Sequence, residues 1–105
     1  MVECKTSIQG FEDIRQYVTE TLSNIELLRP DSTQLTLKLL TRSGQPCGVY
    51  FCLHGPRAVR LSAIWETDAN TILFYGSRGQ RVQRTCLESA PELDVQAFGG
   101  GSCAA

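Results

Sequence analysis

The chain has 105 residues, which fits one domain, and its 42% hydrophobic and 20% charged residues are typical of soluble globular domains rather than disordered or membrane-spanning chains. A formal net charge of −1 produces no overall field that would attract nucleic acid or a membrane. The charge is nevertheless uneven: residues 33–86 carry seven Lys or Arg against two acids, a balance of +5, whereas residues 1–32 and 87–105 each carry −3. We interpret the acidic ends as folding back over the basic middle, with an anion-binding surface on the middle as the alternative.

Five cysteines indicate a reducing compartment rather than a disulfide framework. Their number is odd, and the first residues, MVECKTSIQG, contain no apolar run of the length of a secretory signal, so we expect a cytoplasmic location. Cys47 and Cys52 lie five apart without a second close pair, whereas zinc sites combine two pairs with two to four residues inside each. We therefore expect free thiols, no structural metal and no cofactor.

Residues 10–28 show the spacing of an amphipathic helix. Apolar side chains recur at steps of 3, 4, 4 and 3 on one stripe: Phe11, Ile14, Val18, Leu22 and Ile25. Glu12 and Asp13 in the first turn complement the helix dipole, and Pro30 stops the helix at or before Arg29. A helix with such a one-sided stripe needs a partner surface.

Five segments between residues 33 and 87 alternate as strands do and predict that partner surface. They cover residues 33–42, 47–54, 58–66, 71–76 and 81–87, with turn-forming residues between them. The side chains expected to face the helix are Leu35, Leu37, Leu39, Val49, Phe51, Leu61 and Trp65. The short loops favour pairing of sequential strands. The predicted fold class is therefore α+β, an N-terminal amphipathic helix packed on an antiparallel five-stranded meander sheet.

The last residues carry a second helix signal and then a change of composition. Ser89 followed by Glu92 forms a capping box, which predicts a short helix from Ala90 to Phe98 that Gly99 closes. Residues 99–105 are small and without packing potential, so we predict a single α+β domain over residues 1–98 and a flexible Gly-rich tail over 99–105.

The sequence offers one combination of a nucleophile and a base. Cys52 and His54 fall on the same face of a predicted strand, but their backbones are about 6.5–7 Å apart and no third group that would orient them is evident. The alternative is a strand-end histidine that hydrogen-bonds locally or faces solvent. The chain contains no phosphate-loop pattern, dinucleotide fingerprint or serine-hydrolase motif. We therefore expect no catalytic residues, with a small enzyme centred on Cys52 and His54 as an alternative.

The face of the predicted sheet that the helix cannot cover provides the candidate site. It mixes aromatic, aliphatic and arginine side chains, a composition enriched at protein interfaces. The candidate binding residues are Leu40, Tyr50, His54, Arg60, Ile64 and Tyr75. The strand at 71–76 adds either Leu73 and Tyr75 or Ile72 and Phe74, depending on register. We predict a non-catalytic protein-interaction domain that forms a homodimer, or binds another protein, through this face.

Besides the enzyme centred on Cys52 and His54, two alternatives to this prediction stay open. Nucleic acid or another anion would bind through the arginines of the basic middle segment, which are Arg57, Arg60, Arg78, Arg81 and Arg84. The other alternative is that the C-terminal segment, through Leu93, Val95 and Phe98, covers the second sheet face in the monomer. We expect no membrane partner, because no apolar run approaches the length of a membrane span.

Overall fold

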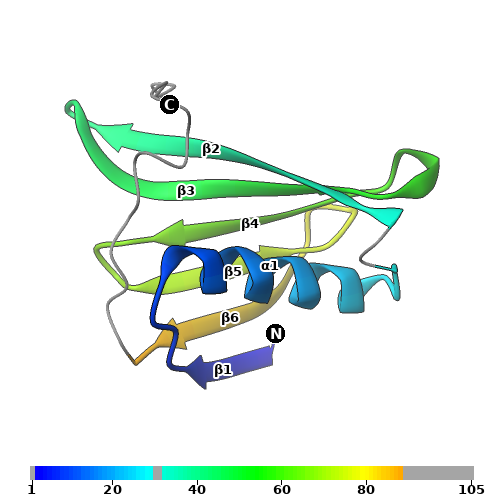
Figure 1. Cartoon of the computed structure of the whole chain (residues 1–105), viewed down its shortest axis with the longest axis horizontal. Helices are drawn as coiled ribbons and strands as arrows, with labels where there is room; N and C mark the ends of the chain where they lie inside the picture. Colours follow the sequence, from blue (N-terminus) through cyan, green and yellow to red (C-terminus); the bar gives the residue numbers. More distant parts are fainter. Residues whose placement is uncertain (1, 30–31, 89–105) are drawn as a thin grey trace.

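The computed structural model describes residues 2–29 and 32–88. It is an α+β fold in which one helix lies on one face of a six-stranded mixed sheet (Figure 1). The elements are β1 (Val2–Thr6), α1 (Phe11–Ile25), β2 (Gln34–Arg42), β3 (Gln45–His54), the 3-10 turn η2 (Pro56–Ala58), β4 (Arg60–Glu66), β5 (Thr71–Tyr75) and β6 (Arg81–Leu87). The predicted packing of a helix on a sheet is confirmed, and the predicted helix at 90–98 and tail at 99–105 lie outside the described residues.

The sheet has the strand order β1-β6-β5-β4-β3-β2. Strands β2 to β6 form the predicted antiparallel meander, in which each strand pairs with the next along the chain. The prediction of a wholly antiparallel five-stranded sheet is wrong, because β1 adds a sixth strand parallel to β6, in register from Val2 opposite Gln83 to Thr6 opposite Leu87. The sequence of β1, VECKT, alternates only weakly, and its partner lies about 80 residues further along the chain, so no local pattern indicates this pairing.

Helix α1 ends at Ile25, earlier than the predicted end at residue 28. Its end is a Schellman motif: the Leu27 N–H donates to the Asn24 carbonyl at 3.3 Å, and the Leu28 N–H donates to the Ser23 carbonyl at 2.7 Å. Leu27 has a φ of 54°, so the chain turns away through a left-handed residue before Pro30 acts. None of the helices in the described part of the chain is both long and apolar enough to cross a membrane.

The core lies between α1 and the sheet face that α1 covers. The helix contributes Phe11, Ile14, Val18 and Leu22, all buried. The sheet contributes Leu39, Val49, Phe51, Leu61, Ala63, Trp65, Ile72 and Phe74, also buried. Leu35 and Leu37 of the edge strand β2, which were predicted on this face, are only half-buried against the core, whereas Leu39 of the same strand is buried.

A small polar network ties α1 to β6 inside this layer. The Tyr17 hydroxyl lies 3.0 Å from Thr85 Oγ1, and Gln83 Nε2 donates to both oxygens, at 3.3 and 3.0 Å. Thr85 is fully buried, so these bonds replace the water that its hydroxyl loses on folding. The network fixes α1 over one side of the sheet, and within residues 2–29 and 32–88 no α-helix lies on the opposite side.

Candidate functional site

The sheet face opposite α1, which we call the open face, carries a continuous row of apolar side chains. Tyr50 on β3 pairs with Ile64 on β4, and Ile64 pairs with Leu73 on β5. Alternate residues of a strand share a face, so the next row contains Cys52, Ser62 and Tyr75. The centre of the open face is therefore aromatic and aliphatic over three neighbouring strands.

The structure places all six predicted site residues on the open face but does not bring them all together. Tyr50 and Ile64 are direct neighbours, whereas Leu40 lies one row further along and His54 and Arg60 form a pair at one end of the sheet. Arg60 is exposed, and the other five are half-buried.

The pairing of β4 with β5 also settles the register that the sequence left open. Leu73 and Tyr75 lie on the open face, and Ile72 and Phe74 are fully buried beneath α1. The fold adds further residues to this face that were not predicted as part of the site, namely Arg84 and Cys86 from β6 and Glu3 and Lys5 from β1. The period-two alternation along β6 would have placed Arg84 and Cys86 on this face. No signal in the sequence indicated that Glu3 and Lys5 of β1 belong to it.

Charged groups frame the apolar centre. Arg84 Nη1 lies 3.2 Å from Glu3 Oε1, an ion pair that links β6 to β1. The Arg81 guanidinium lies 5.8 Å from the centre of the Tyr75 ring and donates a long hydrogen bond of 3.5 Å to its hydroxyl. Both contacts are solvent-exposed, so they hold the side chains in place more than they stabilise the fold.

His54 is held by a neighbour on the edge strand. Its Nε2 lies 3.1 Å from Thr36 Oγ1 on β2, and that hydroxyl also donates to the Cys52 carbonyl at 3.4 Å. These bonds fit the interpretation of a strand-end histidine that hydrogen-bonds locally. In the part of the chain that the structure describes, no group of three or more His, Cys, Asp or Glu side chains is placed to hold a metal ion.

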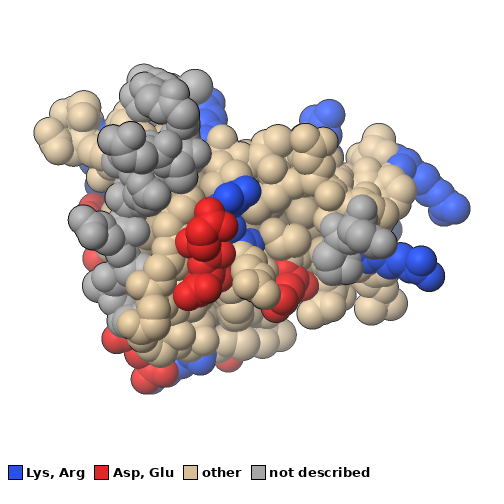
Figure 2. Space-filling view, viewed as in Figure 1, with Lys and Arg blue, Asp and Glu red and all other residues tan. Residues whose placement is uncertain are grey.

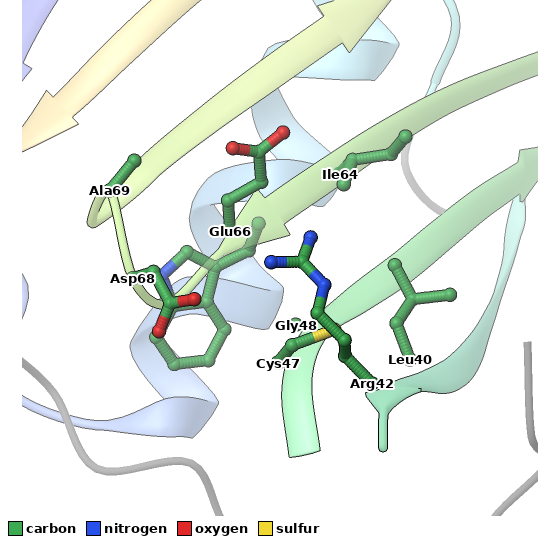
Figure 3. Close-up of a pocket in the computed structure, with 9 residues that line it drawn as sticks. Leu40, Arg42, Cys47, Gly48, Ile64, Glu66, Asp68 and Ala69 are labelled. Atoms are coloured by element: carbon green, nitrogen blue, oxygen red, sulfur yellow. The ribbon is translucent and has the colours of Figure 1, made fainter. Parts of the chain in front are cut away.

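A β-bulge shapes a cavity of about 350 Å³ at one end of the open face (Figure 3). Leu40 pairs with Gly48 but Thr41 pairs with Pro46, so Cys47 is an extra residue in β3. The Cys47 carbonyl accepts hydrogen bonds from the Thr67 N–H at 3.1 Å and the Thr67 hydroxyl at 2.9 Å. The cavity is lined by Leu40, Arg42, Cys47, Gly48, Ile64, Trp65, Glu66, Asp68 and Ala69.

The side chains that line this cavity are charged on one side and apolar on the other, which suits polar contacts at the margin of the open face. In Figure 3 the Arg42 guanidinium points between Leu40 and Glu66, toward Ile64. One guanidinium and two carboxylates, those of Glu66 and Asp68, thus border its apolar wall. A second cavity, of about 430 Å³, lies at β1 and β6, where Glu3 and Arg84 already pair with each other.

Four arginines gather at the opposite end of the sheet. Strands β3 and β5 end there and β4 and β6 begin there, so the two connections bring Arg57, Arg60, Arg78 and Arg81 to one end. Figure 2 shows basic side chains projecting from this end of the molecule, at the right of the view. Arg84, the fifth arginine of the predicted anion-binding set, lies further along β6 in its pair with Glu3.

The open face thus has an apolar centre, a charged margin and one arginine-rich end. Its residues come from all six strands, so its shape depends on the register of the whole sheet. Comparison of the chain with protein-family models, with curated proteins and with solved structures found no match.

Proposed function

We propose that this chain is a non-catalytic protein-interaction domain that self-associates through its open face. The observation that carries the proposal is the row of Tyr50, Ile64 and Leu73, which is half-buried on a face with no helix over it in the described part of the chain. A sheet face that serves only as solvent surface is mostly polar, because one face of an antiparallel sheet can be fully hydrated.

The energetics favour covering this row. Apolar surface gains about 25 cal/mol for each Å² removed from water. Tyrosine rings provide a large, rigid contact area at low entropic cost, and their hydroxyls can hydrogen-bond to water at the margin of an interface. Tyr50 and Tyr75 both lie on the open face, and Arg81 already holds the ring of Tyr75. A partner thus meets a surface in which part of the side-chain ordering is complete before binding.

The size of the face fits a protein partner. The molecule measures 35 × 28 × 22 Å, and the sheet lies across the two longer directions (Figure 1). A standard interface buries about 800 Å² on each partner. A second copy is the commonest partner for such a surface, because a two-fold axis uses the same patch twice.

The test is the mass of the full-length protein at micromolar concentration, measured by sedimentation equilibrium. We expect a dimer for the wild type and a folded monomer for Tyr50→Glu combined with Ile64→Glu, since the double variant places four carboxylates between the two sheets. Circular dichroism checks that the variant keeps the wild-type secondary structure. A monomeric wild type would contradict the proposal.

A matched control separates the open face from a general effect of charge. Val2 and Leu27 are the large apolar side chains that are exposed on the rest of the described surface, at 54% and 91%. Val2→Glu combined with Leu27→Glu adds the same charge away from the open face, and we expect it to remain a dimer. Dissociation of both double variants to the same extent would show that added charge, not the open face, controls assembly.

A second candidate function is anion binding at the arginine-rich end. The observation that favours it is the convergence of Arg57, Arg60, Arg78 and Arg81 from two connections. Fluorescence anisotropy with a labelled single-stranded oligonucleotide tests it, because phosphate contacts weaken steeply as salt rises. Salt-dependent binding that is lost in Arg57→Glu combined with Arg78→Glu would support this function, and no binding at low salt would exclude it.

A further inference from the structure

We infer that two copies pack open face against open face around a two-fold axis that runs across the strands, so that Arg60 of each copy pairs with Glu66 of the other. This inference rests on the proposed self-association and adds the orientation of the partner. Two-fold axes along the strands and across them both bring the open faces together. The two axes differ in which side chains meet, and the side chains of the open face favour the axis across the strands.

Side-chain size is the first argument. The residues Phe51, Ala63 and Phe74 lie level with one another across β3, β4 and β5 and point away from the open face. On the open face, Tyr50, Ile64 and Leu73 form the row on one side of this level. Cys52, Ser62 and Tyr75 form the row on the other side.

An axis across the strands at this level sets the two rows against each other. Tyr50 of one copy then meets Cys52 of the partner, Ile64 meets Ser62 of the partner and Leu73 meets Tyr75 of the partner, so a large side chain faces a small one in two of the three places. An axis along β4 sets each row against itself, so that Ile64 meets Ile64 and Tyr50 meets Leu73 of the partner in one row, while Ser62 meets Ser62 and Cys52 meets Tyr75 in the other. Close packing at an interface core favours the axis across the strands, because the other axis sets large side chains against one another throughout one row.

Charge is the second, independent argument. Arg60 begins β4 and Glu66 ends it, both on the open face and exposed. They are six residues apart, about 20 Å along a strand, and symmetric about the level of Ala63. Within residues 2–29 and 32–88 neither has an ion-pair partner in its own chain. The axis across the strands sets each arginine over the glutamate of the other copy.

The arginine-rich end disfavours an axis along the strands. A two-fold axis along the strands places this end over the same end of the partner and gathers the arginines of both copies, Arg57, Arg60, Arg78 and Arg81 of each chain, at one end of the dimer. Like charges that meet at an interface cost several kcal/mol. The axis across the strands places the arginine-rich end over the end that carries two carboxylates, Glu66 and Asp68, and one guanidinium, Arg42. It also brings Arg84, which keeps its ion pair with Glu3, near Arg81 of the partner.

The experiment is a charge exchange, read out as the dimer dissociation constant by sedimentation equilibrium of the full-length protein at low salt. The variants are Arg60→Glu, Glu66→Arg and the two combined. Each single variant creates two like-charge contacts per dimer, so we expect its dissociation constant to rise at least about tenfold. The combined variant restores both pairs with reversed sign and returns the dissociation constant to within about threefold of the wild type.

Matched controls carry the same change of charge on the helix side. Arg29→Glu and Glu20→Arg are both exposed positions away from the open face, and we expect them to leave the dissociation constant unchanged. A wild-type dimer that the single exchanges do not weaken, or that the combined exchange does not rescue, would overturn the orientation and leave self-association in place. Equal weakening by exchanges and controls would also overturn it. A monomeric wild type would instead refute the proposed function itself.

Discussion

The end of helix α1 contains a strained residue whose replacement should stabilise the protein. Leu27 occupies the left-handed position of the Schellman motif, with a φ of 54°. A residue with a Cβ is destabilised by about 1–2 kcal/mol in this conformation. Glycine commonly fills this position because it has no Cβ to collide with the neighbouring backbone. We therefore expect Leu27→Gly to raise the free energy of unfolding.

The magnitude follows from three contributions. Relief of strain contributes about 1–2 kcal/mol. Glycine lowers the free energy of unfolding by about 0.5–1 kcal/mol, because it loses more backbone freedom on folding than other residues do. The side chain of Leu27 is 91% exposed, so its removal gives up about a tenth of the 1.5–3 kcal/mol that a fully buried leucine contributes. The net gain is about 0.3–0.8 kcal/mol, which corresponds to a rise in Tm of about 1–6 °C for a domain of this size.

Urea denaturation followed by circular dichroism measures this gain, and Leu27→Ala is the control. Alanine removes the same exposed side chain but keeps the Cβ, so the strain persists and we expect no increase in the free energy of unfolding. Equal stabilisation by glycine and alanine would show that the exposed side chain, not the backbone conformation, is the unfavourable feature. No stabilisation by glycine would show that φ at this position is not strained.

Three further predictions address the core, the bulge and the cysteines. Leu22→Ala should lower the free energy of unfolding by about 2–5 kcal/mol, because Leu22 is fully buried between helix and sheet; a loss below about 0.5 kcal/mol in urea denaturation would contradict this packing. Gly48→Ala should cost about 1–3 kcal/mol, since a Cβ at this position would overlap the Trp65 carbonyl oxygen of β4; an unchanged denaturation midpoint would argue against this close approach. Thiol titration of denatured protein prepared without reductant should find all five cysteines free, and three or fewer free thiols, or stoichiometric zinc by elemental analysis, would overturn the expectation.

The helix and the meander were predictable because their signals are local. The stripe from Phe11 to Leu22 has the period of a helix, and the strands alternate with a period of two, so both patterns identify the core face within single elements. The helix end was not predictable in the same way. Leu27 has no intrinsic preference for a left-handed backbone, and Leu28, which packs against Gly55, helps to hold the turn in place from outside the helix.

The candidate site was predictable strand by strand but not across the sheet. Alternation placed Tyr50 and Ile64 on one face, yet it left Ile72 and Leu73 undecided, because a strand that is apolar on both sides contains no internal indication of its register. The bulge at Cys47, which sets the position of the cavity beside Arg42, was also not predicted, although Pro46 and Gly48 on either side of it are residue types that often mark a bulge. Both features depend on pairing between strands, and pairing is a property of the sheet rather than of any one segment.

The parallel pairing of β1 with β6 has a consequence for the order in which the molecule assembles. Each step of the meander closes a short loop, whereas the first strand must find residues such as Arg84, which lies 81 positions after Glu3. The entropic cost of closing a loop increases with its length, so this contact forms after the hairpins that build its template. The bond from the Glu88 N–H to the Thr6 carbonyl then joins the first strand to the residue that follows the last strand. The backbone amides of Val2–Thr6 are accordingly the ones in the sheet that we expect to exchange with solvent first, by local opening that leaves the five-stranded meander intact.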